Sequence, residues 1–270
     1  MTMKIFCSSI KYLKIIDKLP NYILPIGLGE KKFPNHWLDE KKGINIAKLN
    51  DYYGELTGLY WIWKNIIPEL KDNDIIGNCH YRKLWLDKLY FKKNKFSFSN
   101  LNSNLLNENN HDFKKNDCAQ VQPIIFKNKN LVEDFYEIHK TNILLKSADF
   151  LNHEHKNLFL EHLNQNKLHP LNMFITKVQF FRNYCEVIFP WLENCFNLCI
   201  KENLCTGYNK RLPAFLAERF TSYWFSKYEK RINLSYARLG KVYLSNNLNR
   251  ILNPIKIPFT FTGYPTIHRY

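Results

Sequence analysis

Apolar and polar residues along the chain alternate between two patterns, one typical of short buried strands and one typical of amphipathic helices. Residues 4–7 predict a first strand, residues 21–26 predict a second that ends at Gly27 and Gly29, and residues 74–80 predict a third. Helical segments separate and follow these strands. This alternation predicts an α/β fold with a mainly parallel sheet flanked by helices and with a helical C-terminal part.

The strongest helical pattern begins near residue 51. Leu56, Leu59, Tyr60, Trp63 and Ile67 fall at helical spacing, and a proline follows at position 68. The stripe favours packing of these aromatic residues in a core, although their faces would also suit stacking on a base or a sugar.

The remaining segments continue the alternation. Residues 118–126 predict a strand with an edge position or a bend at Pro123, and residues 131–145 predict a helix that carries His139 near its apolar face. A helical region at residues 153–163 leads to a proline turn and a strand at 169–175. Two helices are expected at roughly residues 178–203 and 213–228, the second entered at Pro213.

Two segments differ in composition from the rest. Residues 92–116 are rich in Asn, Ser and Lys, which predicts a mobile insertion within a single domain of residues 1–230. Residues 231–270 contain three spaced prolines and predict a C-terminal wrapping tail close to a membrane. The chain has no apolar run of eighteen residues, so we expect a cytoplasmic protein that contacts the inner membrane peripherally.

Composition narrows the partners only a little. The chain has 39 Lys and Arg against 24 Asp and Glu, a formal charge of +15, which favours nucleic acid, anionic lipid or phosphorylated small substrates. The lysines are scattered, without a basic arm or a single recognition helix. The seven cysteines form no CxxC pair and have no neighbouring His cluster, so we expect reduced core thiols; Cys195 and Cys199, one helical turn apart, lack further metal ligands nearby.

The best candidate chemistry follows the third strand. Parallel sheets bind ligands outside the carboxyl ends of their strands, and His80, Tyr81 and Arg82 occupy such an end. An Arg guanidinium can donate two parallel hydrogen bonds to two phosphate oxygens, and a His or Tyr side chain can donate to a leaving oxygen. The cluster therefore suits the binding of a diphosphate. The alternative is that Arg82 pairs with a carboxylate and His80 is a hydrogen-bonded core residue.

Other motifs exclude or weaken several functions. The tripeptide Asp72-Asn73-Asp74 is similar to the metal-binding D-x-D of many nucleotide-sugar transferases, but it precedes its strand, so we interpret Asp72 and Asp74 as solvated turn residues. We therefore predict no metal ligands, while Mn²⁺ or Mg²⁺ dependence stays open. The chain contains no P-loop, no dinucleotide-binding glycine fingerprint and no G-x-S-x-G.

A carboxylate on the last predicted helix is a candidate base. Phe215 and Arg219 share one helix face, and Glu218 lies about 100° from it, within reach of a cleft. Glu218 could take a proton from an acceptor hydroxyl. The alternative is that Glu218 and Arg219 form an exposed helical charge pair.

Four ordered segments together resemble one bacterial family. These are residues 55–65 (ELTGLYWIWKN), 76–83 (IGNCHYRK), 169–175 (HPLNMFI) and 215–219 (FLAER). The chain is similar over roughly residues 3–228 to a family first catalogued as a domain of unknown function and found in capsule, O-antigen and exopolysaccharide gene clusters. Its pattern is ELTALYWIWKN, IGLCHYRRYF, NMFIM and GFLAERL, and here Gly58, Lys83 and Ala214 depart from it.

The resemblance implies a glycosyltransferase of the GT-A type with a UDP-sugar donor and, in relatives, galactofuranosyl transfer. Carried over by residue, its CHYR maps to residues 79–82, its NMF to residues 172–174 and its ER to residues 218–219. At these positions we expect His80 and Glu218 to be catalytic, and Tyr81, Arg82, Lys83, Asn172 and Arg219 to bind the donor. Lys83 keeps the charge of the family's second Arg but loses its fork. Further candidates within or beside these segments are Glu55, Thr57, His169 and Arg211.

The implied substrates are a donor of galactofuranose or its N-acetyl form and a lipid-linked or oligosaccharide acceptor of a surface polysaccharide. If Glu218 acts directly on the acceptor hydroxyl, the transfer inverts the anomeric centre. Two other functions stay open from the residues alone. One is a basic nucleic-acid-binding module, which the scattered lysines disfavour, and the other is a polysaccharide-decorating phosphoryl-type transferase, which would need a carboxylate pair for a metal.

Overall fold

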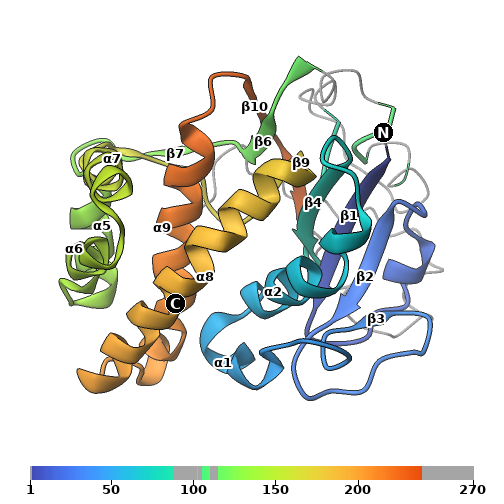
Figure 1. The fold of residues 1–270 in the computed structure, drawn as a ribbon, viewed down its shortest axis with the longest axis horizontal. Coiled ribbons are helices and arrows are strands. Elements are labelled where there is room, and N and C mark those ends of the chain that lie inside the picture. The colour runs from blue at the N-terminus through green and yellow to red at the C-terminus, as the bar shows by residue number, and fades with distance from the viewer. Residues whose placement is uncertain (1, 88–101, 103–104, 110–114, 239–270) are drawn as a thin grey trace, which may run out of the picture.

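The structure, a computed structural model, describes residues 2–87, 102, 105–109 and 115–238 (Figure 1). Within these residues, the main sheet has nine strands, and its central path runs in the order β10-β6-β9-β4-β1-β2-β3. The strands of this path are β1 (Met3–Ser9), β2 (Ile23–Gly27), β3 (Leu38–Asp39), β4 (Ile75–His80), β6 (Cys118–Val121), β9 (Phe174–Lys177) and β10 (Arg231–Leu234). Two further strands, β5 (Lys83–Trp85) and β11 (Tyr236–Arg238), pair with each other, and β5 also pairs with β4.

The sheet is mixed but mostly parallel, as the sequence predicts. β1 pairs in parallel with β2 and β4, β2 with β3, and β10 with β6. β9 lies between β4 and β6 and runs antiparallel to both. The carboxyl ends of β1, β2 and β4 therefore meet the amino end of β9 at one edge.

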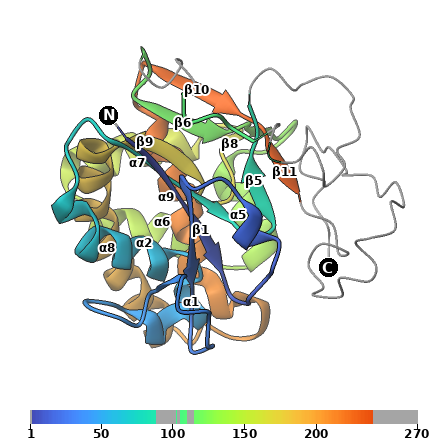
Figure 2. The ribbon, with the colours of Figure 1, turned by 90° about the vertical axis from the view of Figure 1, so that its right-hand side faces the viewer.

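Both faces of the sheet are covered, which explains the nearly continuous apolar runs of its strands. Phe6, Ile76 and Phe174 belong to the core that the helices share, whereas Ile5 and Ile175 belong to the core on the opposite face. Figure 2 shows α2 and α8 on one side of the sheet and the β5–β11 pair on the other.

The helices form two groups. The longer ones, α2 (Leu56–Asn65), α8 (Val178–Lys201) and α9 (Leu212–Ser226), pack on or near the sheet. Smaller helices, α5 (Leu131–His139), α6 (Ile143–Ser147) and α7 (His153–Leu163), lie on the far side of α8 and α9 from the sheet (Figure 1). Short helical segments complete the fold: α1 (Asn50–Tyr53), η1 (Ile16–Lys18), η2 (Ala47–Leu49), η3 (Ile67–Glu69), η6 (Ala148–Phe150) and η7 (Gly207–Arg211).

Three sequence predictions are wrong in detail. The helix expected from residue 51 is two helices, because Gly54 takes a positive φ of 56° between them. The helix expected over residues 131–145 breaks where Lys140 takes a left-handed conformation, after a start fixed by the capping box of Asn130 and Glu133. At Pro123 the expected strand divides into β6 and β7 (Ile124–Ile125), and β7 pairs with β8 (Lys167–Leu168) in a separate small sheet. The bend is confirmed, but β6 is an interior strand.

Other predictions about packing are confirmed. Trp61 is buried, and Trp63 stacks on Phe189 of α8 at a centroid distance of 5.5 Å, so the aromatic stripe of α2 packs in the core. Cys195 and Cys199 are buried and unbridged. α9 begins at Leu212, with a proline in its first turn.

The structure describes only the first part of the predicted C-terminal tail. Residues 231–238, expected as the start of a tail, form β10 and β11 in the main sheet. The rest of the predicted tail and most of the predicted insertion at 92–116 lie outside the described residues. Among the described residues, no helix has the length and apolarity needed to cross a membrane.

Candidate functional site

A cavity of about 370 Å³ opens where the sheet predicts a ligand site, at the carboxyl ends of its parallel strands. β1 contributes Ser8 and β4 contributes His80, and these two residues are paired in register. The opposite wall comes from α9 and from the turns that precede α2 and β9. Its lining comprises Ser8, Ile10, Leu28, Asn50, Asp51, Gly54, Glu55, His80, Tyr81, Arg82, Lys83, Leu171, Asn172, Arg211, Ala214, Phe215 and Glu218.

The turn before β9 delivers Leu171 and Asn172 to the cavity. Both residues have positive φ, 84° and 50°, which is common for Asn but strained for Leu. Asn78 of β4 holds this turn, because its amide nitrogen donates to the Asn172 carbonyl at 2.7 Å and its amide oxygen accepts from the Phe174 N–H at 3.0 Å. A buried Asn in a strand therefore has a structural role at the edge of the site.

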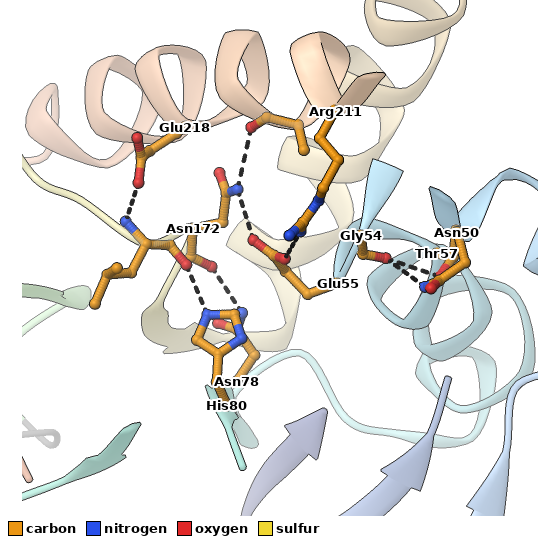
Figure 3. Close-up of polar contacts among 11 residues, drawn as sticks. Asn50, Gly54, Glu55, Thr57, Asn78, His80, Asn172, Arg211 and Glu218 are labelled. Atoms are coloured by element: carbon orange, nitrogen blue, oxygen red, sulfur yellow. Dashed lines mark hydrogen bonds and ion pairs between the residues drawn. The ribbon is translucent and has the colours of Figure 1, made fainter. Parts of the chain in front are cut away.

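The backbone of Leu171 joins the two residues expected to be catalytic (Figure 3). Its N–H donates to Glu218 Oε1 at 2.6 Å, and its carbonyl oxygen accepts from His80 Nε2 at 2.8 Å. Burial lowers the pKa of His80, although the charge of nearby Glu55 opposes the effect. A neutral His80 with its proton on Nε2 keeps Nδ1 as an acceptor.

A second network surrounds Glu55, at the start of α2 (Figure 3). Its Oε1 accepts from the Asn172 amide at 2.9 Å, and its Oε2 pairs with Arg211 at 3.2 Å. Burial opposes ionisation, but the Arg211 guanidinium and the Asn172 amide stabilise the carboxylate, and the pKa of Glu55 lies below its ordinary value. Glu55 is therefore an ionised carboxylate beside the cavity.

Gly54 makes this arrangement possible. Its φ of 56° with ψ of −129° suits glycine alone, and a Cβ at this position would collide with the Arg211 guanidinium. The absence of a side chain lets Arg211 reach over the backbone to Glu55. Asn50 fixes the same turn by donating to the Gly54 carbonyl at 2.9 Å.

Two cations follow β4 into the cavity. Arg82 is exposed, with its guanidinium carbon 5.1 Å from the centroid of the Tyr81 ring. Burial lowers the pKa of Lys83 to about 8, although Glu218 and Glu55 oppose the effect. With Arg211 on the opposite wall, three basic side chains face one cavity. This arrangement suits a ligand with two or more negative charges.

The structure separates Glu218 from Arg219. Glu218 lines the cavity, but Arg219 is buried behind it. Its Nη1 donates to Glu218 Oε2 and its Nη2 donates to Asp134 Oδ2, both at 2.7 Å. The side chains of Arg219 and Asp134 are 4% and 3% exposed. Arg219 therefore orients Glu218 and does not line the cavity, contrary to the expected donor contact, and the pair is not an exposed helical one.

Two other expected site residues lie outside the cavity. Thr57 is buried and donates to the Gly54 carbonyl at 3.0 Å. His169 is buried, its Nδ1 contacts the Val121 carbonyl at 2.8 Å, and burial lowers its pKa to about 4. Both are structural supports at this geometry.

The cavity also contains residues that the sequence analysis missed. Ser8 ends a buried strand, and the position of a polar residue at a strand end was a usable signal. Asn50, Asp51 and Phe215 carried no such signal, because their arrival in the cavity depends on how α1 and α9 pack together.

The residues described here show no group of three or more His, Cys, Asp or Glu side chains able to hold a metal. Asp74 lies at the amino end of β4, opposite the cavity, and its Oδ1 accepts from the Thr2 N–H at 2.8 Å. Asp72 pairs with Arg182 at 2.8 Å. The expected solvated turn is confirmed for Asp72, whose side chain is exposed. Asp74 also lies in the turn, but it is buried rather than solvated, because its carboxylate accepts from the Thr2 and Lys71 N–H groups.

Comparison with known proteins gives a family and a fold. The family described as "Domain of unknown function (DUF4422)" matches residues 4–230. Among solved structures, the apo form of WbbM, a bifunctional glycosyltransferase, is similar with a TM-score of 0.69 at 19% sequence identity. The alignment covers 89% of this chain and 46% of WbbM, so the chain spans about half the length of that protein. No curated protein matches the chain.

Proposed function

We propose that this chain, which belongs to the DUF4422 family, is a glycosyltransferase that moves a sugar from a nucleoside diphosphate donor to a hydroxyl of a saccharide acceptor. The observation that carries the proposal is a single cavity, at the carboxyl ends of parallel strands, in which Arg82, Lys83 and Arg211 face Glu55 and Glu218. The fold shared with a bifunctional glycosyltransferase supports it.

The basic residues would bind the donor's diphosphate. Arg82 offers a guanidinium fork and Lys83 a point charge next to it, at the end of β4. When the bond between the anomeric carbon and the phosphate oxygen breaks, the leaving nucleoside diphosphate gains negative charge. Cations already in place stabilise that charge without reorganising.

Glu218 would act as the general base. It removes the proton from the acceptor hydroxyl while that oxygen attacks the anomeric carbon, so the C–O bond to phosphate breaks as the new glycosidic bond forms. A single displacement of this kind inverts the anomeric configuration. Glu218 is suited to the role because the Leu171 N–H and Arg219 fix its carboxylate, and its side chain is 18% exposed toward the cavity.

His80 and Asn172 would position these groups. His80 donates to the Leu171 carbonyl and so orders the residue whose N–H holds Glu218. The Asn172 amide bonds to Glu55, which in turn pairs with Arg211. We therefore assign His80 as a positioning residue that acts through Leu171 on Glu218.

The finer specificity comes from the family resemblance. We propose a UDP-sugar carrying galactofuranose or its N-acetyl form as donor. The proposed acceptor is a precursor of a capsular or other surface polysaccharide, either lipid-linked at an anionic membrane or a soluble oligosaccharide.

A thermal-shift screen tests the donor class. The purified chain is melted with UDP, GDP, CMP and dTDP and their sugars, with and without Mn²⁺, because selective binding raises the melting temperature. We expect one nucleotide to stabilise the chain and Arg82→Ala to abolish that shift. Arg182→Ala, at an exposed arginine paired with Asp72, is the matched control and should keep it.

Transfer itself is tested with Glu218→Gln. We expect the variant to keep the nucleotide shift and to lose transfer by about 10²–10⁴-fold. No response to any nucleotide, together with salt-sensitive binding of oligonucleotides, would overturn the proposal. An NMR coupling constant showing retained anomeric configuration would overturn the role of Glu218 alone.

A further inference from the structure

An exposed aromatic ring lies against a residue that lines the cavity. The ring of Tyr208 is in η7, the residue is 61% exposed, and the ring stacks on Phe215 with a centroid distance of 5.3 Å and an interplanar angle of 23°. Phe215 in turn lines the cavity. The Tyr208 ring thus extends the aromatic side chain of the cavity wall outward to an exposed position.

This ring is firmly placed. His139 of α5 lies nearly parallel to Tyr208, at 5.9 Å and 14°, and contacts Phe215 at 4.7 Å. Asn209, the next residue, bonds His139 twice: its Oδ1 contacts His139 Nδ1 at 2.7 Å, and its Nδ2 donates to the His139 carbonyl at 3.0 Å. Tyr208 therefore presents its ring from a segment clamped to α5.

The opposite end of η7 is tied to α1 and to the start of α2. Lys210 pairs with Asp51 of α1 at 2.5 Å, and Arg211 pairs with Glu55 at 3.2 Å. Charged groups that donate and accept hydrogen bonds therefore border the aromatic surface. A sugar ring has the matching character, with an apolar C–H face surrounded by hydroxyl groups.

The platform also lies beside the proposed base. Phe215 and Glu218 are three residues apart on α9, a rise of about 4.5 Å, so they occupy neighbouring turns. A hexose whose C–H face lies against the aromatic surface would bring a hydroxyl within reach of Glu218. The strand ends that hold Ser8, Ile10 and Leu28 belong to the other wall, which leaves the α9 wall for the acceptor.

We propose that Tyr208, backed by Phe215, is the stacking platform for the terminal sugar of the acceptor saccharide. This inference rests on the glycosyltransferase function proposed above and assigns the acceptor end of its cavity. It requires an aromatic face at position 208 and does not require the hydroxyl.

The test compares Tyr208→Leu with Tyr208→Phe. Saturation-transfer NMR measures binding of methyl glycosides of glucose, galactose, mannose and N-acetylglucosamine, and of lactose, maltose and cellobiose, to the full chain. We expect Tyr208→Leu to raise the dissociation constant about five-fold, which is the loss of affinity expected for one aromatic stacking contact. Tyr208→Phe should bind these sugars like the wild type. Tyr136→Leu, at a 49% exposed tyrosine of α5 outside the cavity lining, should also bind like the wild type.

Nucleotide-induced thermal shifts of the same variants separate this inference from the proposed function. Suppose that nucleotides stabilise the wild type but Tyr208→Leu binds sugars normally, or that Tyr208→Phe loses as much sugar affinity as Tyr208→Leu. Either result overturns the stacking role of Tyr208 and leaves the proposed transferase function standing. Failure of every sugar to bind the wild type, or loss of nucleotide in place of sugar, also overturns the platform. If no nucleotide binds but sugars bind through Tyr208, the transferase fails and the saccharide site stands.

Discussion

Arg219 provides a sharp test of the structure, because the family resemblance makes it a donor contact whereas the fold makes it a support. Its guanidinium pairs with Asp134 and Glu218, each at 2.7 Å, inside the protein. The substitution Arg219→Ala leaves two carboxylates without this partner. Asp134 keeps Lys129 at 3.0 Å, and Glu218 keeps the Leu171 N–H.

The magnitude follows from burial. Removing one partner of a buried ion pair costs about 3–5 kcal/mol, since the remaining charge is left desolvated. Lys129 compensates partly for Asp134, so we expect a loss near the lower end, about 3 kcal/mol. The guanidinium carbon also lies 5.4 Å from the centroid of the Phe135 ring, and this contact is lost as well.

Urea unfolding followed by tryptophan fluorescence measures this loss. Arg182→Ala is the control, because its ion pair with Asp72 is exposed and should contribute less than about 1 kcal/mol. In a double-mutant cycle with Asp134→Ala, the two losses should not add, since they remove the same pair. If Arg219→Ala unfolds within about 1 kcal/mol of the wild type and yet loses nucleotide-induced stabilisation, Arg219 is a ligand contact and the reasoning fails.

Three further outcomes follow from the same geometry. Burial holds the pKa of Lys83 at about 8, so binding of a nucleoside diphosphate near pH 8 should be accompanied by proton uptake at Lys83. Calorimetry in buffers of different ionisation enthalpy measures this uptake, and Lys83→Gln should abolish it. His162 and His169 have pKa values of about 4 when folded against an ordinary 6.5. As pH falls, the unfolded chain therefore takes up protons before the folded chain does, and the free energy of unfolding should fall between about pH 6.5 and pH 4. The decrease should be smaller in His162→Gln. A free energy of unfolding that does not change over this pH range would contradict the burial of these two histidines. Gly54→Ala should lower the free energy of unfolding by about 1–3 kcal/mol, because Gly54 has a positive φ and its new Cβ would collide with Arg211. Gly207 also has a positive φ but lies in open space, so Gly207→Ala should cost about 1 kcal/mol. Equal losses would show that the Arg211 side chain moves away from the new Cβ.

The sheet was predictable from sequence because its strands are buried on both faces and read as apolar runs. β1 and β4 emerge close to the expected residues for this reason. The breaks were not predictable from apolar spacing. The helical spacing of apolar residues does not change at Gly54 or at Lys140, although a helix ends at each of them. In each case the positive φ of that residue ends the helix.

The site divides along a similar line. His80 ends β4, and Tyr81, Arg82 and Lys83 come directly after it, so the rule that ligands bind at strand ends placed all four in the cavity. Arg219 could not be placed from its helix alone, because its burial depends on Asp134, a residue 85 positions away in another helix. A local pattern therefore identifies residues that leave a strand end, but it does not distinguish a helical residue that faces a ligand from one that holds its neighbour.

The turn at Leu171 shows why the cavity depends on Asn78, a residue outside its lining. Leu171 adopts a φ of 84°, which is costly for a branched apolar residue, and the cost is offset by its contacts with Glu218 and His80 and by Asn78, which bonds the neighbouring residues. Each of these three side chains comes from an element other than the turn. Loss of any one should relax the turn and displace the Leu171 N–H from Glu218, so Asn78 should affect transfer although it does not line the cavity. Its effect should appear as reduced turnover with nucleotide binding retained, because the basic residues that would hold the diphosphate follow β4 independently of the turn.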